Sequence, residues 1–225
     1  MKYLWALIGG LLVGAAVGGL LLYVNPLTGS RAMGVGTFDR VLEYSFPADV
    51  SAFTHSGRAP LPLKPAVVPE LWETAVRSTV LGVITLSGDD ARPEAVASRV
   101  ITPSDRTELL GRGMIADDYW LVTVPGAGSL FVVSESNVWP LVKDTVLPVT
   151  LLGRRWSGAR SYVPTDGPGL RGTALVLGAT GRFEVQEGSA LERYRVNAFS
   201  RSEGLEDLSG ELHLRLLEPS SDPPE

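Results

Sequence analysis

The first hydrophobic pattern of the chain is an uninterrupted apolar run. Residues 4–24 contain no charge and no proline, and a helix of these 21 residues would be about 31 Å long. That length matches the roughly 30 Å hydrocarbon core of a bilayer. Tyr3, Trp5 and Tyr23 lie at its ends, where aromatic rings favour the headgroup level, and Pro26 stops the helix. The pattern predicts a single transmembrane helix that contacts the lipid bilayer through residues 4–24.

This helix is predicted to be an uncleaved anchor. The alternative is a secretory signal, but the apolar part of a signal is only about 7 to 15 residues long. The best small-x-small cleavage site, residues 30–32, has Arg31 in its middle. Lys2 and the amino terminus precede the run, so the positive-inside rule predicts a cytoplasmic amino terminus and an extracytoplasmic body. We therefore expect a membrane anchor over residues 1–29 and a body that is periplasmic if the organism is bacterial.

Small residues form a row along the predicted anchor. Gly10, Gly14 and Gly18 repeat every four residues, and Ala6 extends the row. Small side chains at this spacing let two helix backbones approach closely in lipid, which predicts a membrane-helix partner or a homo-oligomer. The alternative is that glycine and alanine are simply common in membrane helices.

From residue 30 onward the pattern changes to short alternating segments. Leu212, Leu214 and Leu216 alternate with charged or histidine side chains, which predicts a strand with one buried face. Two such runs flank the glycine-rich turn 125–128, an arrangement typical of a hairpin. The predicted strands are 41–46, 80–86, 95–101, 107–115, 119–124, 129–134, 173–177, 182–186, 189–198 and 209–217. Helices of ten or more residues do not separate them, so we expect a mainly β protein with an antiparallel β-barrel or sandwich domain and one or two short helices.

Prolines define the segments between these strands. Residues 47–70 contain five prolines, which predicts an extended, proline-rich excursion within the domain. A short helix is expected over 69–77, with proline at its first position. Residues 137–152 predict a second short helix that ends near Leu147, because Pro148 follows.

Composition bounds the domain and excludes one class of partner. Without Lys2 the chain carries 19 basic and 25 acidic residues, which argues against nucleic acid as a partner. There is no cysteine, so no disulfide stabilises the body. The length suffices for one domain with a substantial core, which we expect over residues 30–218, followed by a disordered tail over 219–225.

A family resemblance lies near the carboxyl end. Residues 173–216 contain a strand, a Gly-x-Thr-Gly-x-Phe turn, a further glycine, another strand and a closing strand led by glycine. The matching residues are Gly178, Thr180, Gly181, Phe183 and Gly188. Their order resembles the last strands of allene oxide cyclase and dirigent-type calycin barrels, although the usual additional glycine is Val185 here. The resemblance implies a barrel with an apolar cup for a small hydrophobic molecule, and it carries over no active-site residue.

Candidate polar chemistry is sparse. His55 and His213 are the two histidines, and without cysteine they predict no metal site. The aspartate pairs at 89–90 and 117–118 are interpreted as turn carboxylates, with acid–base or calcium chemistry as the alternative. The arginine-containing segment 154–171 is expected to be an exposed loop. The sequence has neither a P-loop lysine nor a Gly-x-Ser-x-Gly elbow, so it predicts no cofactor and assigns no catalytic residue.

Aromatic residues give the one candidate for a ligand cavity. Trp120, Trp139 and Trp156, together with Tyr119 and Phe131, could line a cavity for an apolar ligand, and the alternative is that they are ordinary core. We therefore expect a membrane-anchored binding or assembly module that holds a small hydrophobic ligand or a partner subunit. The alternative is a barrel enzyme of cyclase or isomerase type that acts on an apolar substrate.

Overall fold

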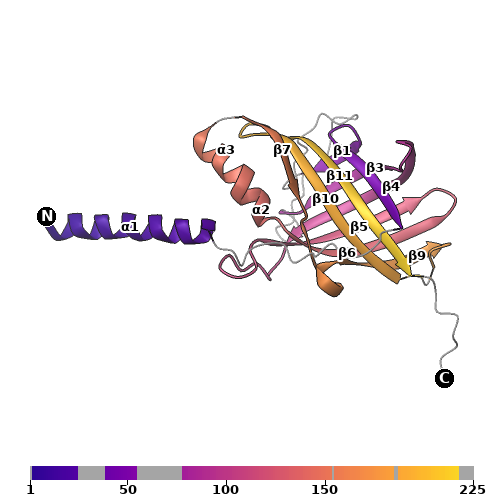
Figure 1. Ribbon diagram of the computed structural model, residues 1–225, viewed down its shortest axis with the longest axis horizontal. Coiled ribbons are helices and arrows are strands. Elements are labelled where there is room, and N and C mark those ends of the chain that lie inside the picture. The colour runs from indigo at the N-terminus through magenta and orange to yellow at the C-terminus, as the bar shows by residue number, and fades with distance from the viewer. Residues whose placement is uncertain (1, 25–38, 55–77, 154, 185–186, 218–225) are drawn as a thin grey trace, which may run out of the picture.

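Eight antiparallel strands close into a barrel in the computed structural model, which describes residues 2–24, 39–54, 78–153, 155–184 and 187–217 (Figure 1). Around the ring the order is β1-β11-β10-β9-β6-β5-β4-β3, and Glu43 of β1 pairs with Ser87 of β3 to complete it. The bounds are β1 Arg40–Phe46, β3 Val80–Ser87, β4 Pro93–Pro103, β5 Ile115–Val124, β6 Gly128–Asn137, β9 Ala174–Gly181, β10 Glu187–Ser200 and β11 Gly204–Leu217. Closure of the ring decides for the barrel and against the sandwich.

Short elements are added to this ring. β2 (Val50–Thr54) pairs with β3, β7 (Trp156–Tyr162) with β10, and β8 (Thr165–Gly167) with β6. After β6 the chain forms one helical segment of three parts: α2 (Trp139–Leu141), the π-helical turn η3 (Val142–Val146) and α3 (Leu147–Leu152). A 3-10 turn, η4 (Leu170–Gly172), precedes β9. The helical segment lies at one end of the barrel (Figure 1).

Most predicted strands are confirmed, and the β5–β6 hairpin has its turn where the glycines predict it. Two predictions are wrong. Residues 107–115 form a loop, in which only Glu108 and Gly113 make an isolated bridge, and the described part of 182–186 is a turn. Three strands were not predicted, because β2 lies in the proline-rich excursion and β7 and β8 lie in the segment expected to be an exposed loop. The helix expected over 69–77 and the tail 219–225 lie outside the described residues.

The helix after β6 does not end before Pro148. It continues to Leu152, and Gly153, with φ of 63°, closes it in the left-handed conformation. The reason is the π-helical turn η3, in which the Leu147 amide donates to the carbonyl of Val142, five residues back. A π turn widens the helix ahead of the proline, and Pro148 then occupies the first turn of α3, where an amide donor is not required.

Alternation of side chains fills the barrel lumen. In β5 every second residue, from Ala116 through Trp120 to Val124, is buried, and the residues between them are more exposed. Leucines and valines from all around the ring form the apolar part of this core. Its members with no more than 2% exposure include Leu42, Leu86, Leu130, Leu212, Leu214, Val122, Val132, Val176 and Val196. The lumen is therefore a packed core along much of its length.

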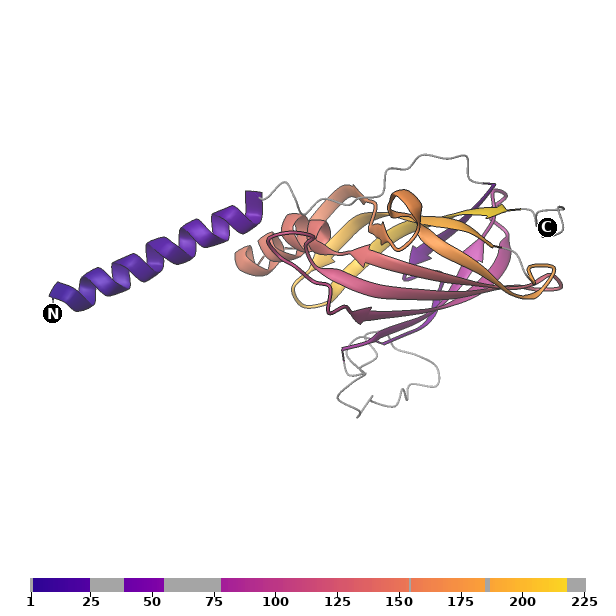
Figure 2. The ribbon, with the colours of Figure 1, turned by 90° about the horizontal axis from the view of Figure 1, so that it is seen from below.

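The amino-terminal helix α1 spans Lys2–Val24 and extends from the end of the barrel that carries the short helices (Figure 2). The Lys143 ammonium of η3 lies 5.8 Å from the ring centroid of Tyr23. No atom lies within 4 Å of a Cβ placed on Gly10, Gly14 or Gly18. A search of the described residues finds no helix long and apolar enough to cross a membrane. The membrane anchor and its orientation remain predictions.

Candidate functional site

Three strands place a charged side chain in the barrel lumen. Arg99 of β4, Asp118 of β5 and Glu192 of β10 share their strand faces with buried apolar residues such as Trp120 and Ala190. Their side chains are 14%, 1% and 3% exposed. Because side chains alternate along a strand, the periodicity that buries Trp120 also brings Asp118 inside. Burying charges in this way is costly unless they pair.

Arg99 satisfies both carboxylates at once. Its Nε and Nη2 donate to the two oxygens of Asp118 at 3.0 and 2.6 Å. Nη1 and Nη2 donate to the two oxygens of Glu192 at 2.7 and 2.6 Å, and Nη1 also donates to the Tyr44 hydroxyl at 3.4 Å. These contacts use all five N–H bonds of the guanidinium, and forked arginine–carboxylate pairs are the strongest class of hydrogen bond in proteins. We call Tyr44, Arg99, Asp118 and Glu192 the lumen cluster.

The lumen cluster bridges opposite walls of the barrel. In the eight-stranded ring, β4 and β10 are four strands apart in either direction. The hydrogen bonds between Arg99 and Glu192 therefore cross the lumen, and direct contact between these side chains leaves no space for a ligand between them. Two further bonds hold these residues in place: Ser136 Oγ donates to the Asp118 carboxylate at 3.1 Å, and the backbone amide of Glu192 donates to Thr165 Oγ1 at 2.9 Å.

Aromatic rings surround the guanidinium. Arg99 Cζ lies 4.2 Å from the ring centroid of Trp120, a distance suited to a cation–π contact. Trp120 in turn meets Tyr44 edge to face, with centroids 5.8 Å apart. Gly210 of β11 makes room for this arrangement, because a Cβ at that position would overlap the Tyr44 ring. The guanidinium of the lumen cluster thus packs against aromatic carbon.

The lumen cluster carries two carboxylates for one guanidinium. Burial raises the pKa of the Glu192 carboxyl, Arg99 opposes this, and the charge of Asp118 adds to it. The Tyr44 hydroxyl donates to Glu192, and burial together with the Glu192 charge raises the pKa of Tyr44 well above its usual value. Burial and the Asp118 charge therefore raise the pKa of Glu192, and the Arg99 guanidinium limits the rise.

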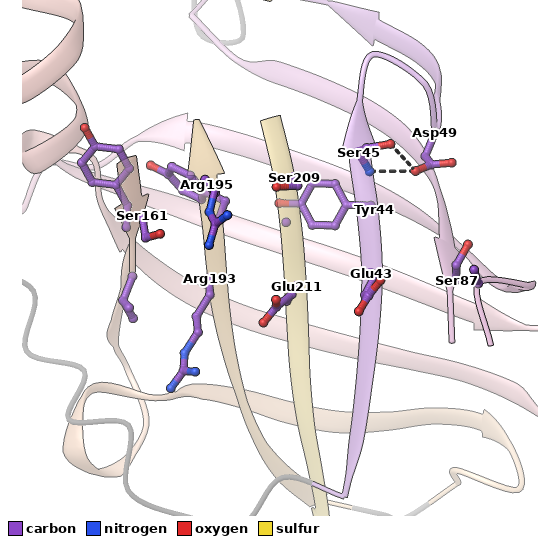
Figure 3. Close-up of a pocket in the computed structure, with 15 residues that line it drawn as sticks. Glu43, Tyr44, Ser45, Asp49, Ser87, Ser161, Arg193, Arg195, Ser209 and Glu211 are labelled. Atoms are coloured by element: carbon purple, nitrogen blue, oxygen red, sulfur yellow. Dashed lines mark hydrogen bonds between the residues drawn. The ribbon is translucent and has the colours of Figure 1, made fainter. Parts of the chain in front are cut away.

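A polar hollow lies on the outer side of the barrel, where β1, β11, β10 and β7 are neighbours (Figure 3). Its volume is about 750 Å³. Arg193 and Arg195 reach it from β10, and Glu43 and Glu211 reach it from β1 and β11. The hollow therefore mixes both signs of charge and does not resemble the apolar cup that the calycin resemblance implies.

Apolar side chains instead occupy the outer side of β3, β4, β5, β6 and β9. Strand register aligns them in two rows across the five strands. One row is Leu81, Val100, Tyr119, Val133 and Leu175, and the other is Val83, Ser98, Leu121, Phe131 and Leu177. We call these ten residues the apolar face. None is charged, and Leu121 and Leu177 are each 42% exposed. A contiguous apolar surface of this kind is a candidate interaction site.

A second ion network fixes the loop between β4 and β5 to the outside of the barrel. Arg112 Nη2 donates to Glu135 at 2.8 Å and to Asp166 at 3.1 Å. Arg106 Nη2 donates to Asp117 at 2.6 Å, and Nη1 also contacts Glu135. Glu135 and Asp166 are buried, so these pairs explain why the segment predicted as a strand over 107–115 folds back as a loop. We interpret this network as a structural feature that holds the loop in place.

The structure does not bring the five aromatic residues of the predicted ligand cavity together. Trp120 faces the lumen, whereas Tyr119 and Phe131 stack on the apolar face with centroids 6.2 Å apart. Trp139 is buried at the start of the helical segment, and Trp156 lies in β7 beneath Arg160. Neighbouring strand residues point to opposite sides, which separates Tyr119 from Trp120.

The glycine turn of the family resemblance has the local geometry that glycine permits. Gly181 has φ of 67°, and a Cβ there would overlap the carbonyl oxygen of Ala127 in the β5–β6 hairpin. Thr180 Oγ1 accepts from the Ser129 amide at 3.0 Å, and Phe183 is buried in the core. In the described part of the chain, no group of three or more histidine or acidic side chains could hold a metal ion. His213 Nε2 lies 2.8 Å from Glu211, and His55 lies outside the described residues.

No family model and no curated protein matches the chain. The resemblance to allene oxide cyclase and dirigent-type barrels therefore rests on the turn residues alone.

Sequence reasoning missed the lumen cluster. Asp117 and Asp118 are not the turn carboxylates that the sequence predicts, because both lie within β5. Asp117 faces outward to Arg106, and Asp118 faces inward to Arg99. A signal was present in the sequence, because Arg99, Asp118 and Glu192 each interrupt the apolar side of an alternating segment. Which of these charges pair could not be inferred, since their partners are far apart in sequence.

Proposed function

We propose that the protein is a membrane-anchored assembly module whose extracytoplasmic barrel associates with a second copy of the chain through the apolar face. The observation that carries the proposal is the distribution of side chains. Charged groups cross the lumen, whereas two uncharged rows of apolar side chains lie on the outside. Binding is therefore favoured at the outer surface rather than inside the barrel.

The lumen cluster argues against a ligand-holding cup. Arg99 and Glu192 touch across the barrel, and the apolar stretch of the lumen is filled by leucines and valines that are almost fully buried. A small hydrophobic molecule would have to displace these side chains or break four hydrogen bonds of Arg99 with carboxylates. A barrel enzyme acting on an apolar substrate, as in the calycin-type resemblance, remains the alternative, with Tyr44 and Glu192 as its polar pair.

The apolar face suits a second copy of the same chain. The ten positions carry no charge, so a contact made through them would rest on apolar burial. An uncharged surface can be complementary to itself, as the isologous interface of a two-fold dimer requires. Tyr119 and Phe131 lie near its middle, and aromatic residues are typical of interface centres.

The anchor supports the same assembly. The uncharged run 4–24 lies within the helix α1, and 21 helical residues would span about 31 Å. The structure describes the side chains of residues 5–21, 23 and 24 in α1, and the proposed span 4–24 also includes Leu4 and Leu22. Gly10, Gly14 and Gly18 form a row of small residues along α1, and small residues at this spacing let a second helix approach closely.

The test is the oligomeric state of the full chain in detergent micelles, measured by light scattering and by crosslinking. Leu121→Glu should weaken the dimer. Leu121 is 42% exposed, so burying the remainder is worth about 1 kcal/mol per copy, and a two-fold interface loses it twice. We expect the dissociation constant to rise about 30-fold or more, since an unpaired carboxylate is also buried.

The matched control is Ser209→Glu, which adds the same carboxylate to an exposed outward position of β11, away from the apolar face. It should leave the dimer intact, and the circular dichroism of both variants should match that of the parent. A parent protein that is monomeric in micelles would overturn the assembly. An apolar small molecule that co-purifies with the monomer would favour the alternative instead.

A further inference from the structure

We propose that the helical segment 139–152 rests on the surface of the bilayer beside the anchor. The inference depends on the proposed anchoring by residues 4–24. It concerns a different surface from the apolar face and a different partner, the headgroup and upper acyl region of lipid.

One side of this segment faces the barrel. Thr145 and Val149 are 1% and 5% exposed, and Thr145 Oγ1 lies 2.8 Å from the Tyr162 hydroxyl of β7. Trp139 is also buried where the segment begins. These contacts fix the orientation of the segment, so its opposite side is determined as well.

The opposite side carries the most exposed apolar residues of the short helices. Leu151 is 75% exposed, and Leu147, one turn before it, is 38% exposed. Leu152, at the end of α3, is 70% exposed. Lys143 precedes Leu147 by a further turn. A row of leucines with a lysine at its margin is typical of helices that lie in the membrane interface, where the lysine reaches the headgroups.

The position of the segment relative to α1 selects lipid as its occupant. Lys143 Nζ lies 5.8 Å from the ring centroid of Tyr23, in the last turn of α1. Tyrosine favours the headgroup level at the end of a membrane helix. In both ribbon views the segment lies at the end of the barrel from which α1 extends (Figures 1 and 2). If α1 crosses the bilayer, the exposed leucines are therefore at the height of the membrane surface.

The experiment measures lipid contact at single labelled positions. The sequence contains no cysteine, so Leu151→Cys in the full chain gives one site for an environment-sensitive fluorophore. The protein is reconstituted into vesicles of phosphatidylethanolamine and phosphatidylglycerol, with or without lipids brominated in the upper acyl chain. We expect blue-shifted emission at position 151 and quenching several times greater than at the control position.

The control is Thr123→Cys, an exposed outward position of β5 next to the hairpin at the far end of the barrel. Brominated lipid should quench the probe at this position little, in the monomer and in the dimer alike. Vesicle flotation separates the two proposals. Protein that floats with vesicles but shows equal quenching at 151 and 123 overturns the surface contact and leaves the anchor intact. Protein that does not float overturns the anchor and this inference together.

Discussion

Replacing Arg99 with methionine should destabilise the barrel far more than the loss of one hydrogen-bonded side chain. Methionine keeps an unbranched stem beside Trp120 but removes the only positive charge of the lumen cluster. Asp118 and Glu192, 1% and 3% exposed, would then face one another without compensation. Breaking a buried ion pair by removing one partner costs about 3–5 kcal/mol, and the loss here falls on two carboxylates. For a domain of this size the melting temperature should fall by roughly 6–20 °C.

The pH dependence distinguishes this cause from a simple packing defect. Without Arg99, the pKa of Glu192, already raised by burial, should rise further. A carboxyl whose pKa is higher in the folded than in the unfolded state contributes stability below its unfolded pKa, and this is lost as the pH rises through the folded pKa. The free energy of unfolding of the variant should therefore increase as the pH falls from about 7 to about 5, and the gap to the parent should narrow.

The measurement is urea unfolding of the full chain in micelles, followed by tryptophan fluorescence at about pH 5 and about pH 7. The variant that also carries Asp118→Asn and Glu192→Gln should recover much of the loss, because it removes the uncompensated charges. A deficit below about 1 kcal/mol at neutral pH, or one equally large at both pH values, would refute the electrostatic account.

Three further predictions follow from single positions. Gly14→Ile should weaken association of the full chain in a crosslinking assay without hindering membrane insertion, whereas Leu12→Ala, off the glycine row, should not; equal signals would mean that the glycines are compositional. Gly181→Ala should lower the free energy of unfolding by more than Gly153→Ala. Both positions have positive φ, but only at Gly181 would the added Cβ overlap the backbone of a neighbouring strand turn. Urea titration should give a loss of about 1 kcal/mol for Gly153→Ala. Glu192→Gln should flatten the loss of stability that the raised Glu192 pKa causes as the pH rises above the usual titration range of a glutamate. Thermal melts across a pH series would measure it, and an unchanged slope would contradict a raised Glu192 pKa.

Local periodicity was sufficient to predict most of the barrel. Segments with one apolar side, such as 209–217, became strands because alternation is decided by neighbours along the chain. The sequence failed where a distant contact decided the structure. Residues 107–115 alternate well enough for a strand, but Arg106 and Arg112 find their carboxylates on other strands and hold the segment as a loop. Pro148 was expected to end a helix, and a π-helical turn accommodates it instead.

The candidate surfaces were less predictable than the fold. In β5 and β6 the runs YWLV and LFVV are apolar at consecutive positions, which shows that both sides of the hairpin are apolar but not which side is solvent. Only the closed ring makes Trp120 internal and leaves Tyr119 and Leu121 outside. The same closure brings Arg99 opposite Glu192, 93 residues away, and no local pattern specifies that pairing.

The lumen cluster places charges inside the barrel, and the apolar face places uncharged side chains outside it. Mutations in the two regions should therefore change different quantities. Charges inside the barrel are compensated within one chain, so changes to Arg99 should alter the stability of the monomer. Apolar side chains outside are fully buried only by a partner, so Leu121→Glu should mainly alter association. It should cost the isolated barrel only about 1–1.5 kcal/mol, for the part of the side chain already buried, which is well below the loss expected for Arg99→Met. If the two regions formed one functional unit, changes at Arg99 and at Leu121 would each alter both stability and association. We expect separate effects because side chains of β4 and β5 alternate between the two regions. The charges that point inward are paired within the chain, whereas the apolar side chains that point outward remain partly exposed.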